Sequence, residues 1–453
     1  MKRPNILFLF PDQHRGDWMP YNKDVFERLG MEELPLRMPN IKRLMDEGTT
    51  FTRTVTSSPL CGPPRACLAS GLRYDKCQVP HNSYNFPLEQ KTFYSVLKDN
   101  GYKVGGVGKF DLNKAVLEWE GDWLDDLKTI GFTDAIDNAG KWDGVMSVKQ
   151  DQPKDPYMRY LAENNLLLMY INDMEERHDL LVDKPTDLPE EGYCDNWIAN
   201  NGINMLKAFP EDKPWFLQAN YSGPHDPWDI TREMKESWKD VDFPLPVNWD
   251  QDNPEKINGV RQNYAAMLEN IDQTIGKFIA EIEKRGELDN TYIIYSADHG
   301  EMLGDFNKFQ KIIPERGSVR IPLVVWGPDV KEGVYSDALV ELQDLAATIL
   351  ELANLSVVED MPEAEDSISL KPILEGKEKT HRDYQVSALK IADNNEWIMI
   401  SDARYKLIVE GENDKNGKCL EKIRLYDLEI DPWEEENIAE KREDIVLNLK
   451  NKL

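Results

Sequence analysis

Apolar runs alternate with segments of helical periodicity along most of the chain. Five short runs, apolar or apolar with glycine, are typical of strands buried on both faces: Asn5–Phe10, Val104–Val107, Trp215–Asn220, Thr291–Ser296 and Ile321–Trp326. Four segments place apolar residues at helical spacing: Met38–Glu47, Phe93–Asn100, Asn196–Ala208 and Asn263–Lys284. Strands that alternate with helices predict an α/β fold, with a large mixed, mostly parallel sheet sandwiched by helices.

Two stretches depart from this alternation. Residues 113–195 are aromatic and acidic with weak periodicity, and we predict an elaborated loop region there, at the rim of a substrate site. Beyond residue 374, three short runs and a final helical segment predict a separate unit with strands at Trp397–Ser401, Tyr405–Val409 and Arg424–Leu428. We therefore predict a catalytic α/β domain over residues 1–374 and a small C-terminal α+β subdomain with an antiparallel sheet over residues 375–453.

Polar residues follow the predicted strands directly. Asp12 comes after the first strand, Lys109 after the second, His225 after the third, and Asp298 with His299 after the fourth. Because the carboxyl ends of parallel strands meet at one edge of a sheet, we expect these side chains to converge on a ligand site.

The net charge of the chain restricts the classes of partner that it can bind. It carries 83 acidic and 54 basic residues, a formal net charge of −29. This surplus argues against nucleic acid and acidic membranes as partners, but it leaves room for one small anion beside a local group of Lys and Arg. No apolar run approaches the length of a membrane span, and the run at Ile6–Phe10 is too short for a secretory signal, so we predict a cytoplasmic protein. Five scattered cysteines predict neither a disulfide framework nor a zinc module.

The most unusual local sequence surrounds Cys61. Gly62, Pro63 and Pro64 follow it, and Arg65 stands four residues on. A thiol at such a loop-to-helix junction would be activated by the helix amides and by the cation. The alternative is a buried structural cysteine beside a proline-rich turn.

The spacing of Cys61, Pro63 and Arg65 resembles the motif of the sulfatase family. Further matches follow in the family's order: Arg3–Leu7, Met38–Ile41, Asn100–Tyr102, Ser296–Glu301, Ser318–Leu323, Arg404–Leu407 and Leu425–Leu428. The chain thus resembles the formylglycine-dependent sulfatases of the alkaline phosphatase superfamily. Some features, such as the pair Asp12-Gln13, are also similar to phosphonate monoester hydrolases.

The resemblance implies roles for individual residues. Cys61 would be oxidised to formylglycine by a maturation enzyme and serve as the nucleophile, with Arg65 beside it. Lys109 and Lys311 would hold the sulfate oxygens, and His225 would protonate the leaving group. Two residues are candidate substrate contacts: Asn82 and Asp111. Asp111 departs from the family, because most sulfatases have histidine there.

The resemblance also implies one divalent metal ion. Its candidate ligands are Asp12, Gln13, Cys61 (as formylglycine), Asp298 and His299. Oxygen-rich ligation favours calcium, whereas the nitrogen ligand and the glutamine, in place of a second aspartate, leave manganese or another divalent ion open.

These inferences predict a sulfuric ester hydrolase that acts on a small sulfated molecule. Among such molecules, we favour a sulfated carbohydrate as the substrate. A phosphonate monoester or phosphodiester hydrolase of the same superfamily is the alternative, and Lys109 favours the sulfatase. An inactive binding homologue is a third hypothesis, against which the joint presence of Cys61, Arg65 and Lys311 argues. The sequence leaves the oligomeric state open.

Overall fold

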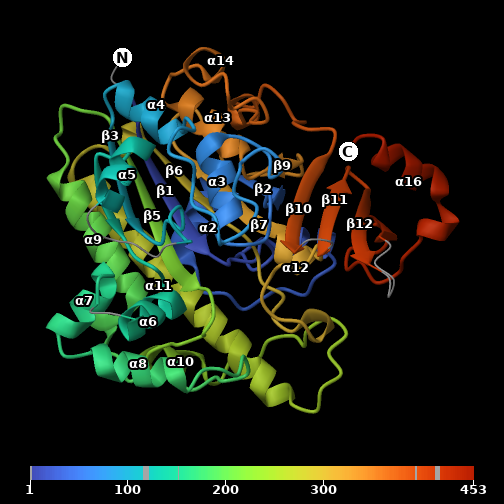
Figure 1. The fold of residues 1–453 in the computed structure, drawn as a ribbon, viewed down its shortest axis with the longest axis horizontal. Helices are drawn as coiled ribbons and strands as arrows, with labels where there is room; N and C mark the ends of the chain where they lie inside the picture. The colour runs from blue at the N-terminus through green and yellow to red at the C-terminus, as the bar shows by residue number, and fades with distance from the viewer. Residues whose placement is uncertain (1–2, 116–121, 151–152, 393–394, 414–418) are drawn as a thin grey trace.

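The computed structural model describes residues 3–115, 122–150, 153–392, 395–413 and 419–453 (Figure 1). Two sheets are present in this part of the chain. The strands of the large sheet are β1 Asn5–Asp12, β2 Thr49–Val55, β3 Lys103–Gly108, β4 Asp134–Asp137, β5 Trp215–Pro224, β6 Thr291–Ser296, β7 Arg320–Trp326, β8 Val334–Ser336 and β9 Val340–Glu341. The strands of the small sheet are β10 Gln385–Ala392, β11 Asn395–Ser401, β12 Tyr405–Asn413 and β13 Cys419–Asp427.

The helices fall between and after these strands. In the first half of the chain they are α1 Lys23–Arg28, α2 Pro39–Asp46, α3 Gly62–Ser70, α4 Phe93–Asp99, α5 Asp122–Ile130, α6 Lys141–Gln150, α7 Pro156–Glu163, α8 Leu167–Glu175 and α9 Cys194–Ala208. In the second half they are α10 Arg232–Trp238, α11 Pro254–Lys284, α12 Arg316–Val319, α13 Asp344–Leu352, α14 Val357–Asp360, α15 Lys371–Leu374 and α16 Glu443–Lys450. None of these helices is both long enough and apolar enough to cross a bilayer.

The large sheet has the order β4-β3-β5-β1-β6-β7-β2-β8, with β9 paired to β2. The strands β4, β3, β5, β1 and β6 are mutually parallel, and β7 runs antiparallel to both of its neighbours. The predicted mixed, mostly parallel sheet is therefore confirmed. The parallel segment places the carboxyl ends of β3, β5, β1 and β6 side by side at one edge.

Both faces of the sheet are covered by helices, as the continuous apolar runs predict. Along β1, Leu7 and Leu9 pack into a core shared with α2, α9 and α11. The alternate residues Ile6, Phe8 and Phe10 pack into a second core shared with α3, α4, α5 and α13. A strand buried on both faces has no polar alternation, so β1 reads as a single apolar run.

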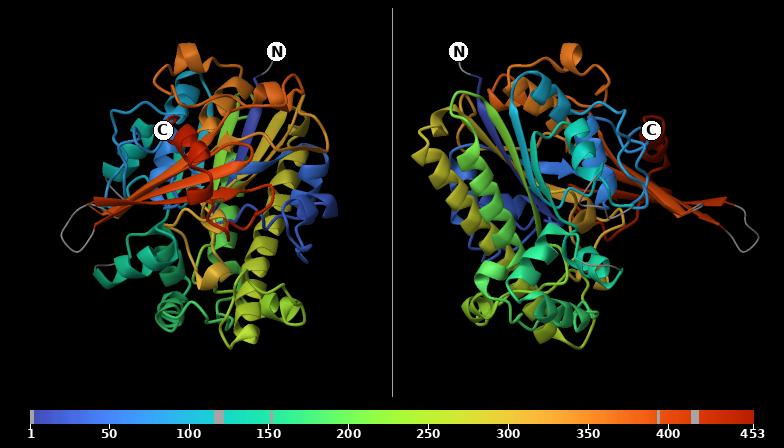
Figure 2. Two further views of the ribbon diagram at one scale, coloured as in Figure 1. Left: turned by 90° about the vertical axis from the view of Figure 1, so that its right-hand side faces the viewer. Right: turned by 60° about the vertical axis from the view of Figure 1, so that its left-hand side comes forward.

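The C-terminal strands form the antiparallel sheet β10-β11-β12-β13, which confirms that part of the predicted fold. One of its faces contributes Trp397, Met399 and Ile408 to a core with Val55 and Val319 of the large domain. The other face packs against α16. Figure 2 shows this sheet extending from the side of the body of the molecule. The division of the chain after residue 374 stays a prediction.

Several elements of the structure differ from the prediction, and one of them is strand β10, which the three predicted C-terminal strands did not include. Residues 113–195 were predicted to be loop, but the described part contains α5–α8 and β4. Strand β2 was missed because its threonines alternate with other residues and interrupt the apolar pattern. Helix α11 begins at Pro254, ahead of the predicted Asn263, and proline is well suited to the first turn of a helix.

Candidate active site and metal cluster

The carboxyl ends of four neighbouring strands carry the candidate residues. Asp12 is the last residue of β1, Lys109 follows β3, His225 follows β5, and Asp298 lies two residues beyond β6. Because β3, β5, β1 and β6 are neighbours in the sheet, these side chains lie close together at its carboxyl edge.

Cys61 comes to the same place from helix α3. It is the N-cap residue, and Pro63 and Pro64 follow in the first turn, where their missing N–H groups cost no intrahelical hydrogen bond. Its side chain is buried, with Sγ 3.7 Å from His299 Nε2 and 3.7 Å from Lys109 Nζ. Burial alone would raise the pKa of the thiol, but the charges of Lys109 and Lys311 hold it well below its ordinary value. The structure thus places the buried Cys61 thiol beside cationic side chains, and its role as the nucleophile stays a prediction.

Four potential ligand groups lie within 4.8 Å of one another: Asp12, Cys61, Asp298 and His299. Asp12 Oδ1 is buried without a hydrogen-bond partner among the described residues, and it lies 3.5 Å from His299 Nε2. His299 Nδ1 donates to the carbonyl of Gly300 at 3.0 Å, which leaves Nε2 directed at the cluster. An orphaned carboxylate oxygen beside an imidazole nitrogen whose hydrogen-bond partner is the Cys61 thiol fits a divalent cation.

Arg65 organises the two carboxylates of this cluster. Its Nη2 lies 2.9 Å from Asp298 Oδ2 and 3.3 Å from Asp12 Oδ2, and its Nε lies 3.1 Å from Asp298. Lys109 forms a second ion pair with Asp12. Burial would raise the pKa of Asp12, but Lys109, His225 and Arg65 hold it well below its ordinary value, so the carboxylate is ionised.

Gln13 lies beside the cluster with its side chain in another network. Its backbone N–H donates to Asp298 Oδ1 at 3.0 Å, while its Oε1 accepts from Lys311 at 2.7 Å and its Nε2 donates to Asp226 at 3.1 Å. The structure thus brings Gln13 to the site, and its role as a metal ligand stays a prediction.

A pocket of about 200 Å³ opens above Cys61. Lys109, His225, Lys311 and Asn82 line it, so the structure places these predicted residues around one small space. Lys311 Nζ donates to His225 Nε2, and His225 Nδ1 donates to the carbonyl of Asp226. Asn82 Oδ1 accepts from the Gly62 N–H at 2.9 Å and so fixes the start of α3.

Asp111 is held between two lysines. Its carboxylate lies 3.2 Å from Lys109 Nζ and 3.1 Å from Lys114 Nζ, at a backbone φ of +52°. The negative charge of Asp111 is therefore neutralised locally by Lys109 and Lys114.

The structure adds residues from the 113–195 segment that the sequence analysis missed. Lys114, Lys141, Trp142 and Asp143 also line the pocket. Lys141 Nζ donates to the carbonyls of His225 at 3.0 Å and Pro227 at 2.9 Å, and so holds the loop that carries His225. No local motif marks these side chains: Lys141, Trp142 and Asp143 come to the site on α6, and Lys114 comes from the segment after β3.

His14 provides a stability prediction for the loop after β1. Its Nε2–H donates to the carbonyl of Trp18 at 2.8 Å and its Nδ1 accepts from the Tyr295 hydroxyl at 2.7 Å, which selects the neutral ring. Burial lowers the pKa of His14 to about 4. Since the unfolded chain binds this proton from about pH 6.5 downward, the folded state should lose about 3 kcal/mol of stability as the pH falls from 6.5 to 4.

The His14→Gln variant should lack the part of the acid-induced loss of stability that comes from His14. Urea unfolding at pH 7 and pH 4.5 measures it: the wild-type free energy of unfolding should fall more steeply between the two pH values than that of the variant. Equal falls in both proteins would contradict the assignment.

Comparison with known proteins agrees with this geometry. The sulfatase family model matches residues 4–355, which is more than three quarters of the chain. The chain belongs to the sulfatase family. A second model, described as the C-terminal region of N-sulphoglucosamine sulphohydrolase, matches residues 304–453. The sulfatase family is one of sulfuric ester hydrolases, within the alkaline phosphatase superfamily.

Relatives of this sulfatase-family chain are distant but match over most of their length. It is 26% identical to an arylsulfatase of Clostridium perfringens, over 97% of this chain and 91% of that protein. It is 24% identical to an N-acetylglucosamine-6-O-sulfatase of Bacteroides thetaiotaomicron, over 98% and 84%. A phosphonate monoester hydrolase of Silicibacter pomeroyi has the same fold, with a TM-score of 0.77 and 20% identity over 99% of this chain and 94% of that one.

Proposed function

We propose that this protein hydrolyses a small sulfate monoester with a formylglycine nucleophile made from Cys61. The observation that supports this best is the position of Cys61, buried between Lys109 and His299 at the floor of a pocket that His225 and Lys311 also line. The proposal includes a maturation enzyme as a partner. Since Cys61 is only 4% exposed in the folded chain, we expect that enzyme to act before folding is complete.

The hydrated aldehyde supplies two hydroxyl groups. One hydroxyl oxygen attacks sulfur, and the bond from sulfur to the leaving oxygen breaks. The second hydroxyl then loses its proton, the aldehyde C=O forms again, and the bond from carbon to the sulfate oxygen breaks. A serine or a thiol cannot perform this second step, because neither carries a second hydroxyl on the reacting carbon.

Lysine and histidine side chains would bind and protonate the substrate. Lys109 and Lys311 lie on the pocket wall and would balance the charge of the sulfate oxygens. His225 Nε2 accepts a hydrogen bond from Lys311 and would pass a proton received from that lysine to the leaving oxygen, since the Nδ1–H is held by the Asp226 carbonyl. Lys141 keeps this loop in place from behind.

The four-residue cluster would hold one divalent cation through Asp12, Asp298, His299 and the residue formed from Cys61. When bound, such an ion supplies positive charge against the developing negative charge of the transferred group. Carboxylate ligands favour calcium, and His299 suits manganese or another divalent ion as well.

A sulfated sugar is the substrate class that we favour. A relative named N-acetylglucosamine-6-O-sulfatase acts on such a compound by its name, and the pocket of about 200 Å³ suits one sulfate group with a small part of its carrier. Trp142 on the pocket wall offers an aromatic surface for a sugar ring.

Phosphonate ester hydrolysis is the second candidate. The pair Asp12-Gln13 and the structural likeness to a phosphonate monoester hydrolase support it, whereas Lys109 in the pocket supports the sulfatase. Parallel assays of aldehyde-bearing enzyme with glycan, aryl and choline sulfates and with a phenyl phosphonate monoester test which of the two functions is the main one. We expect kcat/KM to be higher for a sulfate ester, and a far higher value for the phosphonate would reverse our choice.

The His225→Ala variant tests the proton donor. We expect kcat for an alkyl or sugar sulfate to fall by about 10² to 10⁴, and kcat for 4-nitrophenyl sulfate to fall much less, because an activated phenol leaves without protonation. Steady-state kinetics on both esters measures the difference. An equal loss on both esters would argue against the general-acid role.

A further inference from the structure

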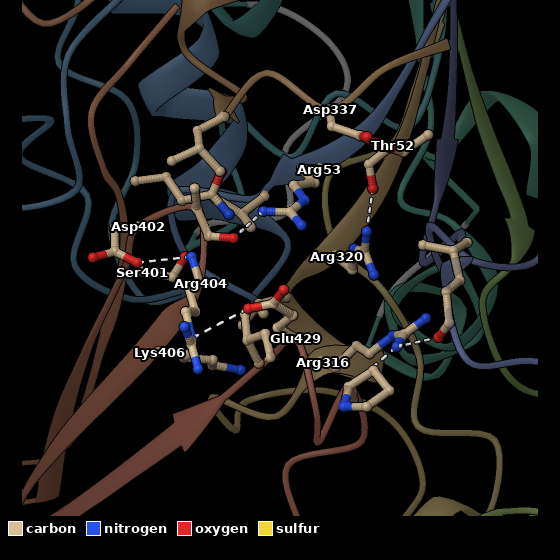
Figure 3. Close-up of a pocket in the computed structure, with 18 of the residues that line it drawn as sticks. Thr52, Arg53, Arg316, Arg320, Asp337, Ser401, Asp402, Arg404, Lys406 and Glu429 are labelled. Atoms are coloured by element: carbon tan, nitrogen blue, oxygen red, sulfur yellow. Dashed lines mark hydrogen bonds and ion pairs between the residues drawn. The ribbon is translucent and has the colours of Figure 1, made fainter. Parts of the chain in front are cut away.

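A second, larger cavity lies between the catalytic sheet and the C-terminal sheet (Figure 3). Its volume is about 630 Å³, and it shares no described lining residue with the catalytic pocket. Strands β2 and β7 and helix α12 form one side, and strands β11 and β12 with the segment 428–434 form the other.

The lining is basic although the chain as a whole is strongly acidic. Six cationic side chains line the cavity against four carboxylates. The cations are Arg28, Arg53, Arg316, Arg320, Arg404 and Lys406, and the carboxylates are Asp337, Asp402, Glu429 and Glu434. In a protein of net charge −29, such a local surplus needs a reason.

Most of these cations have carboxylate partners. Arg28 pairs with Asp337, Lys406 lies 2.6 Å from Glu434, Arg404 lies 2.7 Å from Asp427, and Arg316 lies 3.2 Å from Asp17. These ion pairs account for four of the six positive charges without any ligand.

Arg53 and Arg320 are different. Within the described part of the chain, neither has a carboxylate within ion-pair distance, and each makes one hydrogen bond, Arg53 to the carbonyl of Ala403 and Arg320 to the carbonyl of Thr52. A guanidinium has five N–H donors, so most donors of both residues remain for the cavity. Figure 3 shows both side chains at its wall.

The pairing of β2 with β7 brings these two guanidiniums to one cavity. Val55 of β2 is directly opposite Arg320 of β7, Arg53 lies in the irregular stretch of β2 between Phe51 and Thr54, and both arginines line the cavity. Burial lowers the pKa of Arg320; the charge of Asp17 opposes this shift, and the charge of Arg53 adds to it. Burial and the charge of Arg320 lower the pKa of Arg316 to about 10. The cations therefore repel one another, and an anion between them would relieve this repulsion.

The cavity also has an apolar wall. Val55, Val319 and Met399 line it and belong to the core between the two sheets. The volume of about 630 Å³ is far greater than a bare oxyanion needs and is typical of pockets for small organic molecules.

We propose that this cavity is a second ligand site, which binds a small organic molecule carrying a sulfate or phosphate group. Arg53 and Arg320 hold the oxygens of that group, since a guanidinium fork matches two oxygens of a tetrahedral oxyanion. The organic part lies against Val55, Val319 and Met399. Because the walls come from both sheets, the ligand joins the C-terminal sheet to the catalytic sheet. The site does not depend on the function proposed above.

Calorimetric titration of the full chain tests this proposal with three probes: phenylphosphonate, inorganic phosphate and benzoate. Phenylphosphonate combines a ring with a tetrahedral oxyanion and contains no ester bond to cleave. We expect it to bind about 10-fold more tightly than benzoate, which has the same ring and a planar carboxylate, and more tightly than phosphate, which has no apolar part. Benzoate binding as tightly as phenylphosphonate, or no binding by any probe, would overturn the proposal.

Variants locate the site. Arg53→Gln and Arg320→Lys should each weaken phenylphosphonate binding by about 10-fold, the second because an ammonium group lacks the fork. Arg28→Gln is the matched control: it lines the same cavity but is paired with Asp337, and it should change the affinity by less than about twofold. Lys311→Ala, in the catalytic pocket, should leave this binding event in place.

Two results would contradict the location. Binding that disappears with Lys311→Ala and persists in the Arg53 and Arg320 variants would assign it to the catalytic pocket. If Arg28→Gln weakened phenylphosphonate binding as much as Arg53→Gln, the loss would reflect the total charge of the cavity and not a specific contact with Arg53. Circular dichroism confirms folding of every variant, and unchanged ester hydrolysis confirms it for the Arg28, Arg53 and Arg320 variants. If Arg320→Lys fails to fold, the more accessible Arg53→Gln decides alone.

Discussion

The Cys61→Ala variant is expected to lose sulfate ester hydrolysis by a factor of at least about 10⁴, with the fold intact. The substitution removes the only group proposed to form a bond to sulfur, and binding and charge stabilisation alone leave little turnover. The fold should tolerate the change, because the Cys61 side chain makes no capping hydrogen bond to α3 and alanine removes only one heavy atom. Initial rates with 4-nitrophenyl sulfate and circular dichroism measure both expectations.

Cys67→Ala is the matched control. Cys67 lies in the same helix, and burial raises the pKa of its thiol well above the ordinary value, in contrast to Cys61. It belongs to the core on one face of the sheet, so its loss should lower the free energy of unfolding by about 1 kcal/mol and leave the rate nearly unchanged. Activity that survives Cys61→Ala would refute the formylglycine mechanism. Intact mass spectrometry of the wild type should show the aldehyde on the peptide that contains Cys61.

The Asp12→Asn variant is expected to lose the metal ion. The change keeps the shape of the side chain but removes the charge of a carboxylate whose Oδ1 has no hydrogen-bond partner among the described residues. We expect metal affinity to fall by at least about 100-fold and hydrolysis to fall with it. Elemental analysis of the dialysed proteins should find one divalent ion per wild-type chain and much less in the variant.

Two controls separate metal loss from misfolding. Asp143→Asn also removes a pocket carboxylate, but Asp143 lies outside the four-residue cluster, so its metal content should match the wild type. Chelation of the wild type should abolish activity, and calcium or manganese should restore it. Asp12→Asn leaves Lys109 without one of its partners, so its fold is checked by circular dichroism. An unchanged metal content in Asp12→Asn would exclude the cluster as the metal site.

Much of the fold was predictable because burial leaves a local trace. Strand β1 is covered on both faces, so its first six residues, Asn5–Phe10, form one largely apolar run, and Asp12 is the polar residue at its end. The segment around Cys61 was recognisable because Cys61, Pro63 and Arg65 lie within five consecutive residues. Strand β2 and the helices α5–α8 escaped, because alternating threonines and weak periodicity are compatible with several structures.

The sequence by itself determined the class of fold, the nucleophile candidate and the group of residues expected at the strand ends. Those features depend on the spacing of residues that are close together in the sequence, so they can be predicted from it. Only the tertiary structure decided that Arg65 binds Asp12 and Asp298 and that Lys114 neutralises Asp111. It also decided that Arg53 and Arg320 line one cavity without a carboxylate within ion-pair distance among the described residues. The physical reason is that an electrostatic interaction depends on distance in space and on burial, and residues 267 positions apart along the chain, such as Arg53 and Arg320, carry no sign in the sequence that they will be neighbours.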